Sequence, residues 1–239
     1  MTASHDDIES AFEASWPAAD YAEAGAFRVG RGLGGGKRVA SARAVSSDWT
    51  DTDIDDAIEI HRRWNQPAIF RVLDGEDRLA AALQSRGFRG HTRTRMMMAP
   101  VSALTDLAVP PVTSFAVWPP LAIQHELWAE QGIGRERQAV MARVRLNKAA
   151  LLGRIEDRAA AVGFIAAAGD VAVLHALEVL PAMRRKGLAG WMMREAAFWA
   201  KANGAKSMLL AVTAENTGAV ALYQNLGFSG ISAYRYFQP

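Results

Sequence analysis

The sequence contains no cysteine, and this absence removes several kinds of chemistry. Disulfide bonds, thiolate metal sites and a cysteine nucleophile are all excluded. The chain also lacks an excess of either charge, since 27 basic residues face 25 acidic ones for a formal net charge of +2. Proteins that bind nucleic acid usually carry a basic patch or stripe. The near balance of charge therefore gives no reason to expect a nucleic-acid partner.

No stretch of the sequence is apolar for long enough to cross a membrane. The longest apolar run, from Ala159 to Ala168, ends at Gly169-Asp170, well short of the ~20 residues that a spanning helix needs. Residues 1–10 are polar and acidic, unlike a secretory signal. We therefore expect a cytoplasmic protein without a membrane partner. Half of its 239 residues are hydrophobic, enough for a sizeable core.

A proline-rich segment divides the chain. It contains Pro100, Pro110 and Pro111 and shows no clear helical or strand period. The segment predicts a first domain over residues 1–98, a linker over 99–111 and a second domain over 112–239.

Strand and helix patterns alternate in both halves. The first half predicts strands over 27–31, 38–45, 68–73 and 89–98 and helices over 53–64 and 77–86. The second half predicts strands over 113–117, 149–156, 160–168, 171–180, 207–213 and 231–237 and helices over 120–147 (interrupted near 132–134), 187–203 and 217–226. Antiparallel strands followed by strand-helix-strand-helix-strand indicate a mixed α/β fold, with a twisted central sheet and helices on both faces.

Two segments could suggest a ligand site but are better explained by core packing and by a turn. Met96-Met97-Met98 ends a predicted strand with no other thioether nearby in the sequence, so we expect core packing rather than a soft-metal site. Gly34-Gly35-Gly36-Lys37 lies between two strands and opens no helix, so we expect a hairpin turn rather than a phosphate loop. No metal site is expected.

The end of the first half recurs in the second after a shift of 140 residues, from Gln84 to Gln224. The matched pairs are Gln84 and Gln224, Gly87 and Gly227, Phe88 and Phe228, and Gly90 and Gly230. This recurrence predicts an internal duplication. Position 223 is Tyr but its counterpart is Leu83, and no glycine turn follows the strand that ends at Val45. Only the second half is therefore expected to keep its chemistry.

The segment from Leu177 to Ala189 has the pattern of an anion-binding turn. A strand ends near Pro181, and a helix opens at Gly187, where free N–H donors and the positive end of the helix dipole suit a phosphate. Gly187 allows close approach of the backbone, and the preceding Arg184-Arg185-Lys186 adds positive charge. Neither a Gly-x-x-x-x-Gly-Lys-Ser/Thr loop nor a Gly-x-Gly-x-x-Gly turn is present. Alone, the pattern could be an ordinary basic loop.

Two motifs in this half resemble those of the GNAT acetyltransferase superfamily. Arg184 to Ala189 fits the family signature Arg/Gln-x-x-Gly-x-Gly/Ala on a strand-to-helix turn. Downstream, Ala214 to Phe228 looks like the second family motif, with Asn216, Leu222-Tyr223 and a final Leu-Gly-Phe. The resemblance covers Thr113 to Pro239. A degenerate GNAT-like first half would make the arrangement a tandem one.

The resemblance implies direct transfer of an acetyl group from acetyl-CoA to a primary amine of a small molecule or peptide, without a covalent enzyme intermediate or a metal. It implies that Leu177 and Val179 pair with the pantetheine arm and that the Val179 N–H polarises the acetyl oxygen. Asn216 would contact the pantetheine, cap a helix, or do both. The residues implied at the pyrophosphate are Arg184, Arg185, Lys186, Gly187, Leu188 and Ala189.

The resemblance also implies which residues act as catalytic acid and base. Tyr223 occupies the family position of the general acid for the coenzyme sulfur; a core aromatic on an amphipathic helix is its structural alternative. Many relatives have a base where this chain has Ala211. Glu178 is the best substitute, because an apolar setting would raise the pKa of its carboxyl toward the working range. His175 is the second candidate, and a water chain or no base stays open.

Several alternatives remain at this point. One alternative is that the transferred acyl group is succinyl or propionyl. Another is that the protein is a non-catalytic acyl-CoA sensor or scaffold. The absence of Glu at position 211 favours a non-catalytic protein, whereas the presence of Tyr223 argues against one. Trp191 and Trp199 are expected to pack in the core. The acceptor-side arginines, Arg135 and Arg137 among them, are expected on a solvated face, although an acidic acceptor is not excluded. A homodimer is compatible with the sequence.

Overall fold

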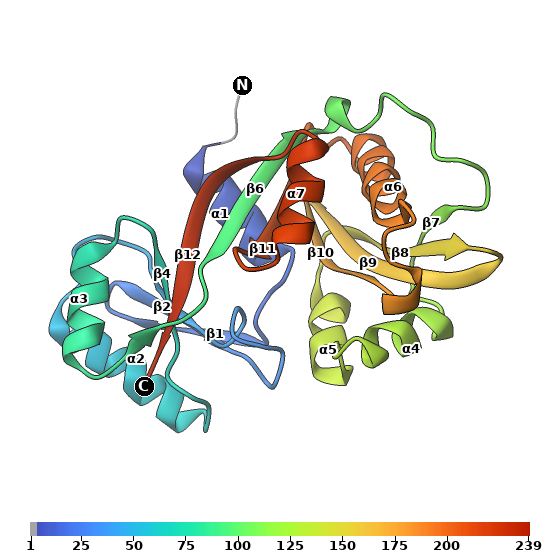
Figure 1. Ribbon diagram of the computed structural model, residues 1–239. Helices are drawn as coiled ribbons and strands as arrows, with labels where there is room; N and C mark the ends of the chain where they lie inside the picture. Colours follow the sequence, from blue (N-terminus) through green and yellow to red (C-terminus); the bar gives the residue numbers. More distant parts are fainter. Residues whose placement is uncertain (1–3) are drawn as a thin grey trace. The chain divides into compact units, whose positions relative to one another are not determined.

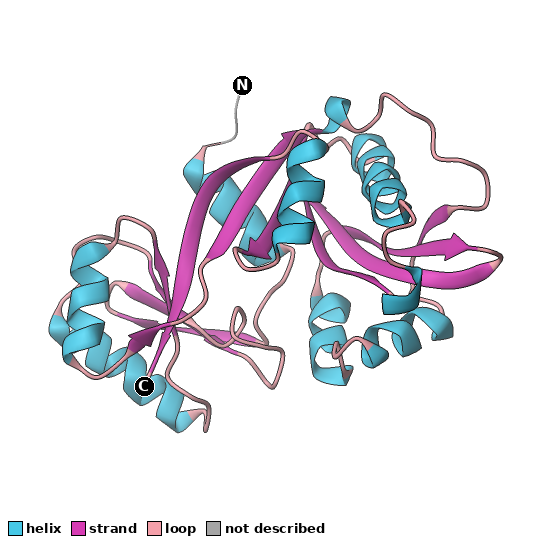
Figure 2. Ribbon diagram, viewed as in Figure 1, coloured by secondary structure: helices cyan, strands magenta, loops and turns pink. Residues whose placement is uncertain are grey.

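The structure, a computed structural model, describes residues 4–239 and groups them into two compact units (Figure 1). Unit 1 contains the described residues up to Trp16 together with residues 96–212 and 217–231. Unit 2 contains residues 17–95, 213–216 and 232–239. Both units combine strands and helices (Figure 2), as the predicted mixed α/β fold requires. Over residues 4–239, none of the helices has the length and apolar character to cross a membrane.

Unit 1 is built on a six-membered strand order, β6-β11-β10-β9-β8-β7. Its strands are β6 (Thr94–Pro100), β7 (Ser114–Val117), β8 (Asn147–Ile155), β9 (Arg158–Ala168), β10 (Val171–Val179) and β11 (Ser207–Thr213). Its helices are α1 (His5–Ala14), α4 (Ala122–Glu130), α5 (Arg135–Arg143), α6 (Leu188–Ala202) and α7 (Thr217–Asn225). Strands β7 to β10 are antiparallel, whereas β10 and β11 are parallel.

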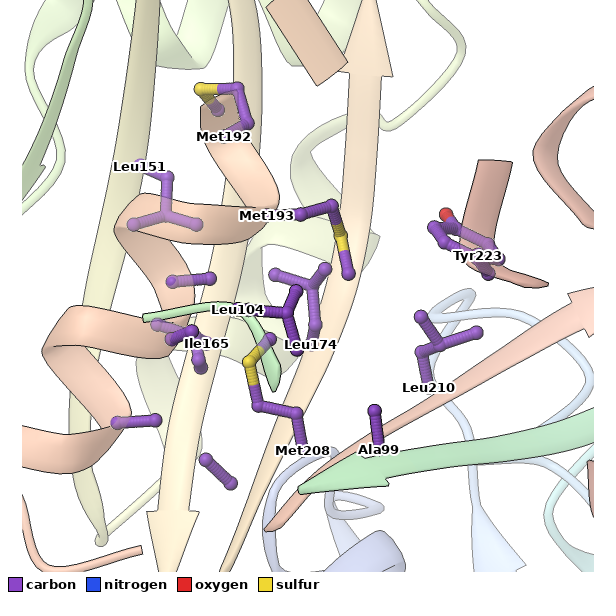
Figure 3. Packing of buried hydrophobic residues seen from close by; sticks show 14 of the residues in the cluster. Ala99, Leu104, Leu151, Ile165, Leu174, Met192, Met193, Met208, Leu210 and Tyr223 are labelled. Carbon is purple, nitrogen blue, oxygen red and sulfur yellow. The ribbon is translucent and has the colours of Figure 1, made fainter. Parts of the chain in front are cut away.

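The core of unit 1 lies between the sheet and α6. Met192 and Met193 on the buried face of α6 lie in one hydrophobic cluster with Leu151 of β8 and Ile165 of β9 (Figure 3). Strand β9 is buried along most of its length, in keeping with its nearly unbroken apolar sequence. Gly187 (φ 82°) and Gly204 (φ 84°) flank α6 in the left-handed conformation that glycine adopts without steric cost. These two glycines set where the helix begins and ends.

Unit 2 has the strand order β1-β2-β3-β4-β12, with β5 also paired to β12. Its elements are β1 (Asp20–Ala24), β2 (Phe27–Arg31), β3 (Ala42–Ala44), α2 (Asp51–Arg63), β4 (Phe70–Leu73), α3 (Asp77–Ser85), β5 (Arg89–Gly90) and the end of β12 (Ser229–Gln238). Phe27, Phe70 and Phe88 form the aromatic centre of its core, with neighbouring ring centroids 5.5–5.6 Å apart. Strands β2 and β3 are antiparallel, so the glycine run lies in a hairpin connection as predicted. The connection spans residues 32–41, however, so the strand predicted over 38–45 is limited to residues 42–44.

The compact units do not follow the predicted boundaries at 1–98 and 112–239. Residues 234–237 of β12 pair with β4, and the end of this C-terminal strand, from residue 232, belongs to unit 2. Conversely, residues 96–98 at the end of the predicted first domain belong to unit 1, and Met96 and Met97 are buried there as expected. Prolines indicate where a helix or strand ends locally. The compact units, in contrast, are defined by contacts between residues far apart in the chain. The proline-rich segment therefore predicts a connection but not the partners of the strands around it.

Candidate active site

Strands β10 and β11 separate halfway along their length. Their parallel pairing joins Val171–Leu174 to Ser207–Leu210 and, within the described chain, goes no further. At the same point β10 has a bulge, because His175 lies opposite Phe164 but Glu178 lies opposite Val162. Ala176 has a φ of 51°, which is uncommon for a residue with a side chain. The bulge turns β10 away from β11 and leaves the backbone of residues 176–179 without a neighbouring strand on that side.

The bulge is held from the other elements of unit 1. The indole Nε1–H of Trp128 donates a hydrogen bond to the Ala176 carbonyl at 3.0 Å. A side chain at Gly163 would come within 3.3 Å of Leu177 Cδ1, so the glycine makes room for Leu177. The Leu180 N–H donates to the Ala160 carbonyl of β9. Because successive N–H groups of a strand point to opposite edges, the Val179 N–H points away from β9, toward the open side.

The turn after β10 presents uncapped N–H donors. Arg185 (φ 65°) and Gly187 (φ 82°) are both left-handed, and Gly187 is the N-cap of α6 without any side-chain cap. The Arg184 N–H is used by the Pro181 carbonyl, but those of residues 185–189 donate to no group in the described part of the chain. A Cβ at Gly187 would meet nothing within 4 Å. Such a helix start fits a pyrophosphate, which needs converging donors and positive charge.

The three basic side chains of the turn are exposed and differ in their partners. Arg184 Nε donates to the Val179 carbonyl at 2.9 Å, which ties the turn to the end of β10. Lys186 Nζ donates to Glu156 Oε1 at 2.8 Å in the β8–β9 turn. Lys186 also lines a surface cavity of about 330 Å³ together with Trp191. Trp191 is therefore not a core residue, whereas Trp199 packs against the core as expected.

Tyr223 and Glu178 are brought together from α7 and β10. Tyr223 is buried, and its ring lies 5.9 Å from that of Phe228. Burial, and then the negative charge of Glu178, raise the pKa of Tyr223 to about 12. Burial also raises the pKa of Glu178 above its ordinary value, against the opposing charges of Arg184 and Arg137. The pair can thus offer a phenol that keeps its proton and a carboxylate that is more basic than usual.

His175 and Asn216 are placed differently from this pair. His175 is buried, with Nε2 2.9 Å from Ser15 Oγ and its ring stacked on Phe164, a setting that favours a packing role. Asn216 directly precedes α7 and its N–H donates to the Thr213 carbonyl. Asn216 groups with unit 2, and its contact with pantetheine stays a prediction.

The sequence did not predict the role of Trp128, and it placed Arg137 on a solvated face without linking it to Glu178. Trp128 holds the bulge, and the charge of Arg137 acts on Glu178. No local pattern predicts either interaction, because each joins α4 or α5 to a strand that comes much later in the chain. In residues 4–239, no group of three or more His, Asp or Glu side chains could hold a metal ion.

Comparisons with known proteins agree with this geometry. Residues 117–228 match the model of the Acetyltransferase (GNAT) family. Over 76 residues the chain is 38% identical to the uncharacterized N-acetyltransferase YobR of Bacillus subtilis (strain 168); the match covers 32% of this chain and 31% of that protein. This chain therefore spans less than a third of that relative's length.

The fold is also shared with solved structures. A GCN5-related N-acetyltransferase from Kribbella flavida superposes with a TM-score of 0.71 at 19% identity, over 97% of this chain and 93% of its own. A tandem GNAT protein from the clavulanic acid biosynthesis pathway superposes with a TM-score of 0.59 at 11% identity, over 83% of this chain and 74% of its own. At such identities the likeness concerns the fold alone. The matched residues 117–228 contain both the turn at Gly187 and Tyr223, so the part of the chain that carries the candidate site is similar to the GNAT family of acetyltransferases.

Proposed function

We propose that unit 1 transfers an acetyl group from acetyl-CoA directly to a primary amine of a small molecule or peptide. The main support is the uncapped, left-handed start of α6 at the end of a strand that has separated from its parallel neighbour. A long ligand with an anionic middle and a linear arm matches these two features together. The anion would lie at the helix start and the arm along the open edge of β10.

Each part of the coenzyme has a proposed partner in this arrangement. The N–H groups of Arg185, Gly187, Leu188 and Ala189 hold the pyrophosphate, with Arg184 and Lys186 adding charge. The exposed edge at Leu177 and Val179 pairs with the pantetheine arm. The Val179 N–H donates to the acetyl oxygen as negative charge develops there. Asn216, from the second family motif, is the further proposed contact of the arm.

The chemistry needs one proton acceptor and one hydrogen-bond donor. Glu178 takes a proton from the ammonium of the acceptor, and the neutral amine attacks the thioester carbon. A C–N bond forms, the C–S bond breaks, and the second proton that the nitrogen loses passes to the departing thiolate. Tyr223 faces the departing sulfur. Thiols have a pKa of about 8.5, well below that of Tyr223 at about 12. The phenol therefore stabilises the thiolate by a hydrogen bond rather than by complete proton transfer.

Two measurements test this function. Calorimetric titration with acetyl-CoA should give saturable binding, and a thiol-release assay over amino acids, polyamines, aminoglycosides and peptide amino termini should give turnover with at least one amine. Binding without turnover on any of these amines would instead favour a sensor or scaffold. Faster turnover with succinyl-CoA or propionyl-CoA would reassign the acyl group. Absence of coenzyme binding would contradict the proposal.

A further inference from the structure

The first turn of α5 is tied to the bulge that carries Glu178. Gln138 Nε2 donates to the carbonyls of Ile133 (2.8 Å) and His125 (3.0 Å), which fixes the turn between α4 and α5. The Ile133 N–H donates to the Trp128 carbonyl at 2.8 Å. Trp128 in turn donates to the Ala176 carbonyl in β10. This chain of hydrogen bonds sets α5 against the strand that presents the proposed base.

Arg137, in that first turn, is the cation of α5 whose charge acts on Glu178. Its side chain is exposed and forms no ion pair or hydrogen bond with another residue of the described chain. The other cation that acts on Glu178 is Arg184, which is already engaged with the Val179 carbonyl beside the proposed pyrophosphate site. The ammonium group of Lys148 is also hydrogen-bonded within the protein, because its Nζ donates to the carbonyls of Met141 and Ala142 near the end of α5. Of the two cations whose charge acts on Glu178, Arg137 is therefore the one whose side chain has no partner among the described residues.

A carboxylate and a guanidinium whose charges act on each other are together the complement of a zwitterion. Glu178 attracts the ammonium of an incoming amine, and Arg137 offers a planar fork of donors that matches a carboxylate. Resting on the proposed acetyl transfer, we propose that Arg137 selects acceptors that carry a carboxylate a few bonds from the reacting amine, as free amino acids do. An amine of the same shape without the carboxylate would leave the guanidinium without its partner.

Matched acceptor pairs test this selection on the full chain with acetyl-CoA. The pairs are L-lysine with cadaverine and L-phenylalanine with phenethylamine, each an amino acid and its decarboxylated amine. We expect kcat/KM to favour the acid by about tenfold or more, the usual strength of a charged hydrogen bond. Arg137→Gln should reduce this ratio toward one, mainly through the KM of the acid. Arg135→Gln, a neighbouring exposed arginine without action on Glu178, should leave the ratio unchanged.

Arg137→Lys separates acceptor binding from a simple charge effect on Glu178. Lysine keeps the positive charge but loses the fork, so the pH–rate profile should stay near that of the wild type while the preference for the acid falls. An unchanged preference in Arg137→Gln, or turnover of both members of each pair at equal kcat/KM in the wild type, would overturn the inference and leave the proposed function intact. Bound acetyl-CoA without transfer to any amine would overturn both.

Discussion

Each unit contains a helix that follows a strand, α6 after β10 and α2 after β3, but the starts of these two helices have opposite electrostatics. In unit 1, α6 begins at Gly187 with no side-chain cap, no acidic residue in its first turn and three basic residues before it. In unit 2, α2 begins at Thr50, whose hydroxyl accepts from the Asp53 N–H while the Asp53 carboxylate accepts from the Thr50 N–H. The second helix satisfies its own donors and places negative charge where an anion would bind. A matching fold element is therefore not a matching site.

The helix ends, by contrast, agree closely across the shift of 140 residues. Gly87 has a φ of 85° and Gly227 one of 86°. The Phe88 N–H donates to the Leu83 carbonyl at 3.0 Å, and the Phe228 N–H donates to the Tyr223 carbonyl at 2.9 Å. The backbone geometry is repeated, but the side chain that could act on a thiolate is present only in unit 1. This pattern supports the hypothesis of a duplication in which the first half lost its chemistry.

Introducing a carboxylate at the open helix start should have the largest effect. Gly187→Glu places negative charge beside the donors, and like charges in contact cost several kcal/mol, so acetyl-CoA affinity should fall by more than about 100-fold. Gly204→Glu is the matched control, because it imposes the same left-handed strain (φ 84°) at the far end of α6. Calorimetry should show equal losses of stability in the two variants and a loss of binding only in the first. Equal affinities in the two variants would remove the helix start from the site.

Removing the phenol should affect turnover more than binding. Tyr223→Phe keeps the packing against Phe228 but loses the donor to the sulfur, so kcat should fall by about 100-fold with little change in coenzyme affinity. Steady-state kinetics and calorimetry on the same variant check both parts. A similar fall in affinity would make Tyr223 a binding residue, and an unchanged kcat would leave it a packing residue like its counterpart Leu83.

On the acid side of the pH–rate profile, the loss of activity should follow protonation of Glu178. Burial raises the pKa of this carboxyl, so activity should be lost as pH falls through a value above the ordinary range for glutamate. Glu178→Gln should lower kcat/KM and remove that limb. The same variant should be more stable than the wild type at neutral pH, because it no longer buries a partly desolvated charge. An unchanged profile would exclude Glu178 as the base.

Unit 2 should have its own pH signature, unrelated to catalysis. Burial lowers the pKa of His61 from 6.5 to about 4, so the unfolded chain takes up a proton first as the pH falls. Stability should therefore decline between pH 6.5 and 4, by up to about 3 kcal/mol at ~1.4 kcal/mol per pKa unit. Denaturant unfolding of His61→Gln should show a flatter dependence on pH. His91→Gln, at an exposed position, should keep the wild-type slope.

The smallest effect is expected at the capped helix of unit 2. Thr50→Ala removes the hydroxyl that accepts from the Asp53 N–H, which should lower the stability by about 1 kcal/mol. Acetyl-CoA affinity and turnover should not change, because this helix start is not a coenzyme site. Denaturant unfolding measures the stability of the variant, and calorimetry measures its affinity for acetyl-CoA. Reduced coenzyme affinity in this variant would show that the two helix starts are not independent in function.

Local patterns were sufficient for the turn and most of the elements. The strand before Pro181, the basic residues and Gly187 are neighbours in the chain, and the left-handed N-cap follows from them. Helix α1 and strand β1 were missed, and the helical region over 120–147 proved to be α4 and α5 followed by the start of β8.

Contacts between distant residues could not be predicted in the same way. Trp128 and Ala176 are 48 positions apart, and nothing in either segment identifies the other. The pairing of β12 with β4 likewise depends on the whole fold rather than on the residues of β12. The hydrogen bond from Trp128 to β10 and the effect of the Arg137 charge on Glu178 are of this kind, which explains why both emerged only from the structure.

The stoichiometry of acetyl-CoA binding tests the difference between the two units most directly. Calorimetric titration of the full chain should give one coenzyme per chain, and Gly187→Glu should abolish it while Thr50→Ala leaves it intact. Two coenzymes per chain, or one that survives Gly187→Glu, would contradict the assignment of the site to the helix start of α6.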